Sequence, residues 1–228
     1  MISKQLFFPV VAIFFCLPVF SRTIEKTIKL PEPELKGKKT FEEVLLKRRS
    51  IRLYKDDALL LNQISQLMFA AQGITAPWGG RTSPSAGATY PVEIYLVAGN
   101  VEGLKPGLYH YIVSSHSLVQ KASGDIRKML SLAALKQKSI EKAPATIVIA
   151  AEFSRTTGRY GERGIRYVYM EAGHVSQNIY LQAESIGLGT VAIGAFDDKL
   201  VKDIMKIDQD VLYLMPVGKK SSEGEKHD

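Results

Sequence analysis

The segment 164–198 constrains the fold more than any other part of this 228-residue chain. Its first half carries apolar residues at steps of three and four, namely Ile165, Val168, Ala172, Val175, Ile179, Ala183 and Ile186. Because such steps return to one face of a helix, they predict a long amphipathic helix packed against a core. Gly187 and Gly189 stand where a helix commonly ends. The apolar run 190–193 predicts a short buried strand, and Gly194 gives the backbone freedom just beyond it.

The rest of the chain mixes helix and strand patterns without a regular strand–helix–strand order. Helical patterns cover residues 41–49, 59–73, 126–135 and 199–205, and strand patterns cover 92–98, 107–111, 145–151 and 211–217. Thr40 and Glu43 have the spacing of a capping box that opens the first helix. This order favours a layered α+β domain over a doubly wound parallel sheet.

Residues 1–21 have the layout of a secretory signal, because Lys4 precedes an apolar run that ends at Phe20. The run is shorter than the roughly 20 residues of a membrane-spanning helix, and it contains two prolines. We therefore expect cleavage and export to the periplasm or the exterior, with an uncleaved membrane anchor as the alternative. Residues 22–39 are expected to form an extended arm, and residues 221–228 a disordered tail.

Charge and cysteine content narrow the possible partners. Lys and Arg total 30 against 23 Asp and Glu, which gives a formal net charge of +7. The excess is scattered except for one cluster at residues 47–52, so the pattern disfavours a nucleic-acid binder. The single cysteine, Cys16, lies in the signal segment. The exported chain would therefore have no disulfide, thiol nucleophile or cysteine-bound metal.

Two short segments suit a ligand. The basic cluster offers guanidinium forks and a hydroxyl, which bind phosphate well, from Arg48, Arg49, Ser50 and Arg52. A solvated basic helix end explains the same cluster equally well. The loop 83–91 could cradle a ring or a phosphate through Ser85, Gly87 and Thr89, although an ordinary loop is the simpler interpretation.

Glu171 and His174 show the Glu-x-x-His spacing of di-iron helical bundles. No other histidine in the chain has a glutamate three residues before it, so the sequence lacks the second pair that such a site needs. We expect no metal site and interpret His174 as a hydrogen-bonded interior or interface residue. Small residues on the same helix would permit close approach of another helix, within the chain or across a dimer.

Four ordered motifs resemble a known family: RRSIRLY, PSAGATYPVEIYLV, RYGERGIRYVYMEAGHVSQNIYLQAESIGLG and TVAIGAFDD. Together they are similar to the FMN-dependent nitroreductase superfamily, and within it to the SagB-type dehydrogenase branch. The resemblance covers residues 40–220. It implies a mixed β-sheet flanked by helices and a homodimer that binds two FMN molecules at its interface.

The resemblance also implies roles for residues at three places. The FMN phosphate, ribityl chain and pyrimidine edge would be held by Arg48, Ser50 and Arg52, with Arg49 as a neighbouring candidate. The isoalloxazine would lie against Pro84, Ser85, Ala86 and Gly87, typically of the other subunit. A backbone amide, that of Gly194, would face flavin N5 from the loop of Ile193, Gly194 and Ala195. Basic residues after the last strand, here Lys219 and Lys220, would close the phosphate site.

The implied activity is ping-pong hydride transfer through FMN between NADH or NADPH and a small organic substrate. Trp78, Tyr160 and Phe196 are candidates for lining the substrate pocket. A flavin-binding carrier or sensor without turnover is one alternative. Oxidation of a peptide azoline to an azole is another, and it would need basic side chains near the flavin. Arg159, Tyr160 and Arg163 lie in the corresponding region of the sequence.

Overall fold

The computed structural model describes residues 26–222, so the expected signal segment and most of the expected tail lie outside the described residues. Within that range, seven strands form one sheet in the order β1-β4-β3-β2-β5-β7-β6. Their bounds are β1 Thr27–Lys29, β2 Val92–Ala98, β3 Gly107–Ile112, β4 Ser117–Ser123, β5 Ala145–Ala151, β6 Leu188–Thr190 and β7 Asp210–Lys219. All neighbouring strands pair antiparallel. The sheet is mixed only through single parallel bridges such as Ser50–Thr190.

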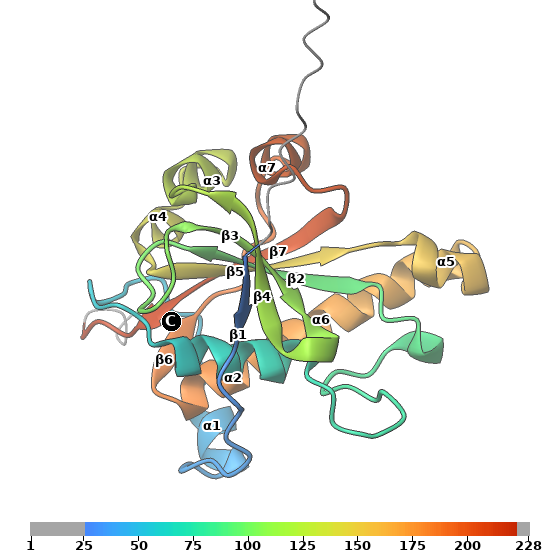
Figure 1. Ribbon diagram of the computed structural model, residues 1–228, viewed down its shortest axis with the longest axis horizontal. Helices are drawn as coiled ribbons and strands as arrows, with labels where there is room; N and C mark the ends of the chain where they lie inside the picture. The colour runs from blue at the N-terminus through green and yellow to red at the C-terminus, as the bar shows by residue number, and fades with distance from the viewer. Residues whose placement is uncertain (1–25, 223–228) are drawn as a thin grey trace, which may run out of the picture.

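Helices cover both faces of this sheet (Figure 1). Their bounds are α1 Phe41–Lys47, α2 Leu61–Gln72, α3 Arg127–Ala133, α4 Lys138–Lys142, α5 Ser154–Tyr160, α6 Arg163–Ser185 and α7 Asp198–Met205. On β5, Ile147 packs into the core shared with α2 and α6, while its neighbour Val148 packs into the core shared with α3 and α7. Because successive strand residues face opposite sides, one fully apolar strand supports both layers. The expected α+β fold is confirmed.

The long helix is confirmed and ends as expected. α6 spans Arg163–Ser185, and Gly187 beyond it has a φ of 77°, the left-handed conformation typical of a helix C-terminus. The strand expected at residues 190–193 is shifted, because β6 is Leu188–Thr190. Gly189 belongs to the strand rather than to the helix end. A Cβ there would lie 2.6 Å from the Cβ of Ile51, so only glycine allows the segment around Ile51 to pack against β6.

The N-terminal arm is more ordered than expected, because it contributes β1 and the buried residue Leu30. His116 ties this arm to the domain. Its backbone oxygen accepts a hydrogen bond from the Leu30 amide at 3.1 Å, and its Nε2 lies 2.8 Å from Ser65 Oγ. The sequence also did not predict β4, α4 or α5. Among residues 26–222, no helix combines the length and the apolar character needed to cross a bilayer.

Candidate functional site

The basic segment 48–52 has two faces. It runs extended beside β6, with the Ile51 amide donating to the Thr190 oxygen at 2.9 Å. On one face, the Arg48 guanidinium lies 5.1 Å from the centre of the Tyr180 ring, and Ser50 Oγ lies 3.1 Å from the Tyr180 hydroxyl. On the other face, Ile51 packs against Gly189, and Arg49 and Ile51 line a separate cavity. This alternation follows from the extended backbone, in which successive side chains point to opposite sides.

The Tyr180 hydroxyl joins this segment to the loop after β6. Besides its contact with Ser50, it accepts a hydrogen bond from the Ala192 amide at 2.7 Å. Ala192 directly precedes the predicted flavin-facing residues Ile193, Gly194 and Ala195. Two predicted parts of one cofactor site, far apart in the sequence, therefore meet at one side chain of α6.

The loop that carries Gly194 is paired to β7 and lines a cavity. Ile193 exchanges two backbone hydrogen bonds with Leu214 of β7, both at 2.9 Å. Gly194 and Phe196 line a cavity of about 580 Å³ together with aromatic residues that include Phe153 and Tyr169. The cavity lies within the size range of small-molecule sites. Phe196 was expected to line a substrate pocket. Trp78, another candidate liner, is instead 79% exposed.

The loop with Pro84, Ser85, Ala86 and Gly87 packs against α5. Gly87 has a φ of 60°, and a Cβ at this position would lie 2.5 Å from the Tyr160 hydroxyl. Arg159 Nη1 donates to the Gly87 oxygen at 3.1 Å. The absence of a side chain at Gly87 therefore lets Arg159 and Tyr160 approach the loop backbone closely. Of the three residues named for the azoline alternative, these two contact the predicted flavin-facing loop.

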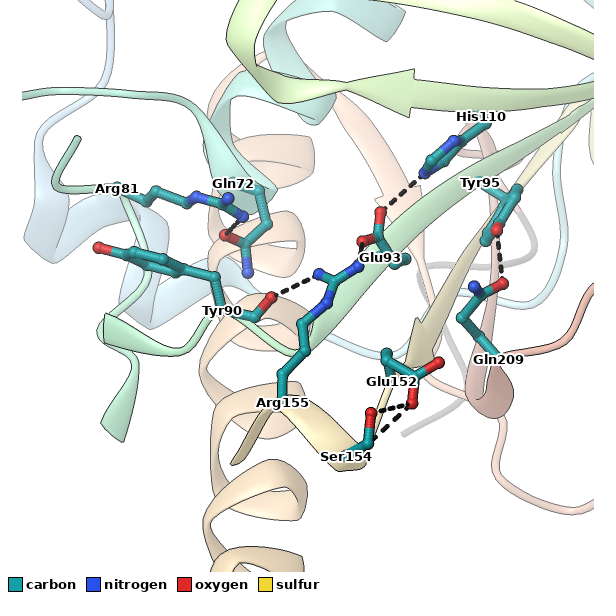
Figure 2. Close-up of polar contacts among 10 residues, drawn as sticks. All are labelled: Gln72, Arg81, Tyr90, Glu93, Tyr95, His110, Glu152, Ser154, Arg155 and Gln209. Atoms are coloured by element: carbon teal, nitrogen blue, oxygen red, sulfur yellow. Dashed lines mark hydrogen bonds and ion pairs between the residues drawn. The ribbon is translucent and has the colours of Figure 1, made fainter. Parts of the chain in front are cut away.

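Beneath this loop lies a buried polar pair that the sequence did not reveal. Glu171 of α6 is 2% exposed, and its Oε1 has no hydrogen-bond partner within residues 26–222. The same holds for Nε2 of Gln72, whose Oε1 accepts a hydrogen bond from Arg81 at 3.1 Å. Arg81 in turn lies 4.1 Å from the centre of the Tyr90 ring, at the end of the loop (Figure 2). Burial raises the pKa of the Glu171 carboxyl.

A second polar cluster fixes the point where the loop enters β2 (Figure 2). Arg155 of α5 donates to the Tyr90 oxygen at 2.9 Å and pairs with Glu93. The other oxygen of Glu93 lies 2.7 Å from His110 Nε2 on β3. Burial opposes ionisation of Glu93, but the hydrogen bonds from His110 and Arg155 lower its pKa below the ordinary value. Only the strand alternation of residues 92–98 hinted that Glu93 would face away from the apolar core.

The family of the chain follows from comparison with known proteins. The model of the nitroreductase family matches residues 45–219, which is most of the chain and contains all the elements just described except the arm, α1's first residues and Lys220. The chain belongs to the nitroreductase family. This confirms the resemblance noted in the sequence.

Individual known proteins are similar to the chain over different shares of its length. A Methanocaldococcus jannaschii protein that bears the name nitroreductase MJ1384 is 49% identical over 194 residues, which cover 85% of this chain and 98% of that protein. McbC, the microcin B17-processing protein of Escherichia coli, is 31% identical over 134 residues, but these cover only 57% of this chain and 49% of McbC. A solved structure from Ralstonia eutropha, named as a nitroreductase, has a TM-score of 0.76 and 27% identity, and the match covers 96% of this chain and 97% of that one.

The remaining residues predicted for the cofactor site lie elsewhere. Lys219 pairs with Asp57 at 3.1 Å, and Lys220 pairs with the buried Glu184. Both lysines line the same cavity as Arg49, on the face of the basic segment that points away from Tyr180. The structure thus groups Arg48 and Ser50 with Ala192, and it groups Arg49 with the two lysines.

Within residues 26–222, no three His, Cys, Asp or Glu side chains gather closely enough to hold a metal ion. Glu171 is buried, whereas His174 is exposed, so the two side chains of the Glu-x-x-His pair do not converge. The interior interpretation of His174 is therefore wrong for the single chain, because the side chain lies on the outer face of α6. The interface interpretation stays a prediction.

The residues present suit the FMN that nitroreductases generally use. Arg48 and Arg52 supply guanidinium groups and Ser50 a hydroxyl, which is a donor set for a phosphate. Gly194 carries no side chain, and the nearest atom to a Cβ there would be 3.6 Å away on Tyr213, so its backbone is accessible. Arg48, Ser50 and Arg52 therefore suit the phosphate end of FMN, and the accessible backbone at Gly194 suits its ring end.

Proposed function

We propose that this protein is an FMN-dependent oxidoreductase that transfers hydride between NADH or NADPH and a small organic substrate. One observation carries the proposal. The Tyr180 hydroxyl connects Ser50, in the segment suited to the phosphate, with Ala192, in the loop suited to the ring. A single cofactor that spans both segments explains why they are brought together.

In this proposal the chain binds and orients, and bound FMN would supply the two-electron chemistry. Arg48, Ser50 and Arg52 bind the phosphate end through charge-assisted hydrogen bonds. The Gly194 amide, next to the Ile193–Leu214 backbone pairing, would supply a hydrogen-bond donor to the ring end of FMN, where negative charge would develop on reduction. The cavity beside Gly194 admits the donor and the acceptor in turn, which corresponds to a ping-pong order.

The test is a spectroscopic titration of the purified chain. We expect a yellow complex when FMN is added, and anaerobic bleaching when NADH or NADPH follows. A protein that never takes up FMN would contradict the proposal. Uptake of FMN without reduction by any donor would instead favour the alternative of a flavin-binding carrier or sensor.

We further propose that two copies of the chain assemble through α6. The outer face of this helix exposes Ile165, Tyr169 and Met170, whose exposed fractions are 42, 56 and 50%. Beside them, a Cβ on Gly173 would meet no atom within 4 Å, so this face is open to close approach by another helix. Met170→Glu should shift sedimentation toward the monomer. Leu132→Glu, the same kind of apolar-to-acidic change at an exposed position of α3, is the control and should leave the dimer intact. An unchanged dimer in Met170→Glu or an already monomeric wild type would refute the arrangement.

Oxidation of an azoline ring is the second candidate, and the contacts of α5 favour it. Arg159 and Tyr160 lie against Gly87, where the Tyr160 oxygen could accept a proton from a ring during its oxidation and the Arg159 guanidinium could stabilise the negative charge on that oxygen. McbC, a relative, is a microcin-processing protein. If this candidate is correct, Arg159→Ala with Tyr160→Phe should abolish turnover of a thiazoline peptide but leave reduction of the cofactor by NADH unchanged. No turnover of the peptide by the wild-type protein would eliminate it.

We also propose that residues 1–21 direct export. The basis is the sequence alone, in which Lys4 precedes an apolar run that ends at Phe20. N-terminal sequencing of the natural protein should then begin near Arg22. Recovery of intact Met1 from the soluble cytoplasm would refute cleavage and export together.

A further inference from the structure

A basic cavity of about 660 Å³ lies on the face of segment 48–52 that points away from Tyr180. Six cationic side chains line it, together with a single carboxylate, that of Glu184. The cations are Lys39, Lys47, Arg49, Lys55, Lys219 and Lys220. They come from the arm, α1, the segments that flank Ile51 and the end of β7, so the fold collects them from four parts of the chain.

The carboxylate is already neutralised. Glu184 is 4% exposed and pairs with Lys39 at 3.1 Å and with Lys220. Lys219 is paired with Asp57. Within residues 26–222, however, Lys47 and Lys55 make no hydrogen bond or ion pair through their ammonium groups, and Arg49 bonds only through Nη1, to backbone oxygens. Three cations therefore face the cavity with unused donors.

The walls of the cavity also contain apolar surface. Leu46 and Ile51 line it beside the cations, and Ile51 is held in place against Gly189. A volume of this size exceeds what a bare phosphate needs and falls within the range of small-molecule sites. Unused cations next to an apolar wall suit an organic ligand with at least two negative charges.

We propose that this cavity is a second anion site that binds a phosphorylated small molecule, separate from the flavin. The separation follows from the alternation along the extended segment. Arg48 and Ser50 contact Tyr180 on one side, whereas Arg49 and Ile51 line the cavity on the other. Arg49, Lys219 and Lys220, predicted from the sequence to hold the flavin phosphate, serve this second site instead. The proposal does not depend on the activity proposed above.

Inorganic pyrophosphate is the probe, titrated calorimetrically into the full chain both as purified and after saturation with FMN. We expect pyrophosphate to bind in both cases with the same affinity. Lys47→Ala with Lys55→Ala should weaken pyrophosphate binding by about tenfold or more, because two charged donors are lost. FMN affinity should not change in this variant.

Lys128→Ala with Lys138→Ala is the matched control. It removes the same charge from exposed positions in α3 and α4 and should leave pyrophosphate binding at the wild-type value. Equal weakening of pyrophosphate binding in both double variants would show that pyrophosphate is attracted by net charge alone, and it would overturn the proposed site. Displacement of pyrophosphate by FMN would also overturn it, because the cavity would then be the flavin phosphate site. Absence of pyrophosphate binding to the wild-type chain would refute it directly.

Discussion

The two faces of segment 48–52 differ in what surrounds their cations. On the Tyr180 face, Arg48 lies over an aromatic ring, and within the described residues neither Arg48 nor Arg52 makes an ion pair. On the Glu184 face, lysines already surround a buried carboxylate. The guanidinium groups on the first face are therefore available to a ligand, whereas two lysines on the second face are paired with Glu184. These five consecutive residues therefore present two separate sets of side chains, because successive side chains of an extended backbone point to opposite sides.

The largest expected effect is a loss of FMN affinity when arginines on the Tyr180 face are replaced. Arg48→Ala and Arg52→Ala should each weaken FMN binding by about 1.5–3 kcal/mol, which is roughly 10- to 150-fold, because each removes a charged hydrogen-bond donor. Fluorescence titration of FMN measures the change. Arg49→Ala is the control on the second face and should leave FMN affinity near the wild-type value. Equal losses of FMN affinity in all three variants would show that both faces bind FMN. Unchanged affinity in Arg48→Ala and Arg52→Ala would contradict the assignment of these arginines to the phosphate.

A smaller effect tests the connection between the first face and the loop at Gly194. Tyr180→Phe removes the acceptor of the Ala192 amide, and we expect a loss of about 1–2 kcal/mol in the free energy of unfolding. FMN binding should weaken in the same variant, because Ser50 and the loop lose their common partner. Urea denaturation measures the first quantity. Tyr213→Phe, whose hydroxyl bonds to no described residue, is the control for stability and should leave the free energy of unfolding unchanged. A Tyr180→Phe protein as stable as wild type would contradict the connection.

The sequence predicted most of the large elements because their patterns are strong. α6 was recognisable from its helical spacing, β5 from its continuous apolar run, and the start of α1 from the capping box of Thr40 and Glu43, which the structure confirms. β1 and α5 were not predicted, for physical reasons. β1 is a three-residue edge strand that pairs only with β4, and α5 contains a glycine and two threonines, which are weak helix formers.

The site was predictable in its residue types but not in its grouping. The motif resemblance selected Arg48, Ser50 and Gly194 as members of candidate segments, but no local pattern shows that Tyr180 joins them. The grouping of Arg49 with Lys219 and Lys220 depends on the bridge between Tyr54 and Lys220, which is a contact between distant residues. Glu171 was noticed for its spacing to His174. Its actual surroundings, Gln72 and Ser85, come from two other segments.

The smallest expected effect compares the two buried carboxylates of α6. Glu184 has two lysine partners, whereas Oε1 of Glu171 has no hydrogen-bond partner within the described residues. Because burial raises the pKa of Glu171 above its ordinary value of 4.5, the native state holds this proton more tightly than the unfolded state does. This contribution to stability is complete below pH 4.5 and is lost as the pH rises through the raised pKa.

Glu171→Gln removes the titration, so the variant should gain stability relative to wild type as the pH increases. Urea denaturation at a series of pH values measures this difference. Glu102→Gln, at an exposed surface position, should run parallel to wild type, and a Glu171→Gln curve that also runs parallel would show that the carboxyl is not held in its protonated form.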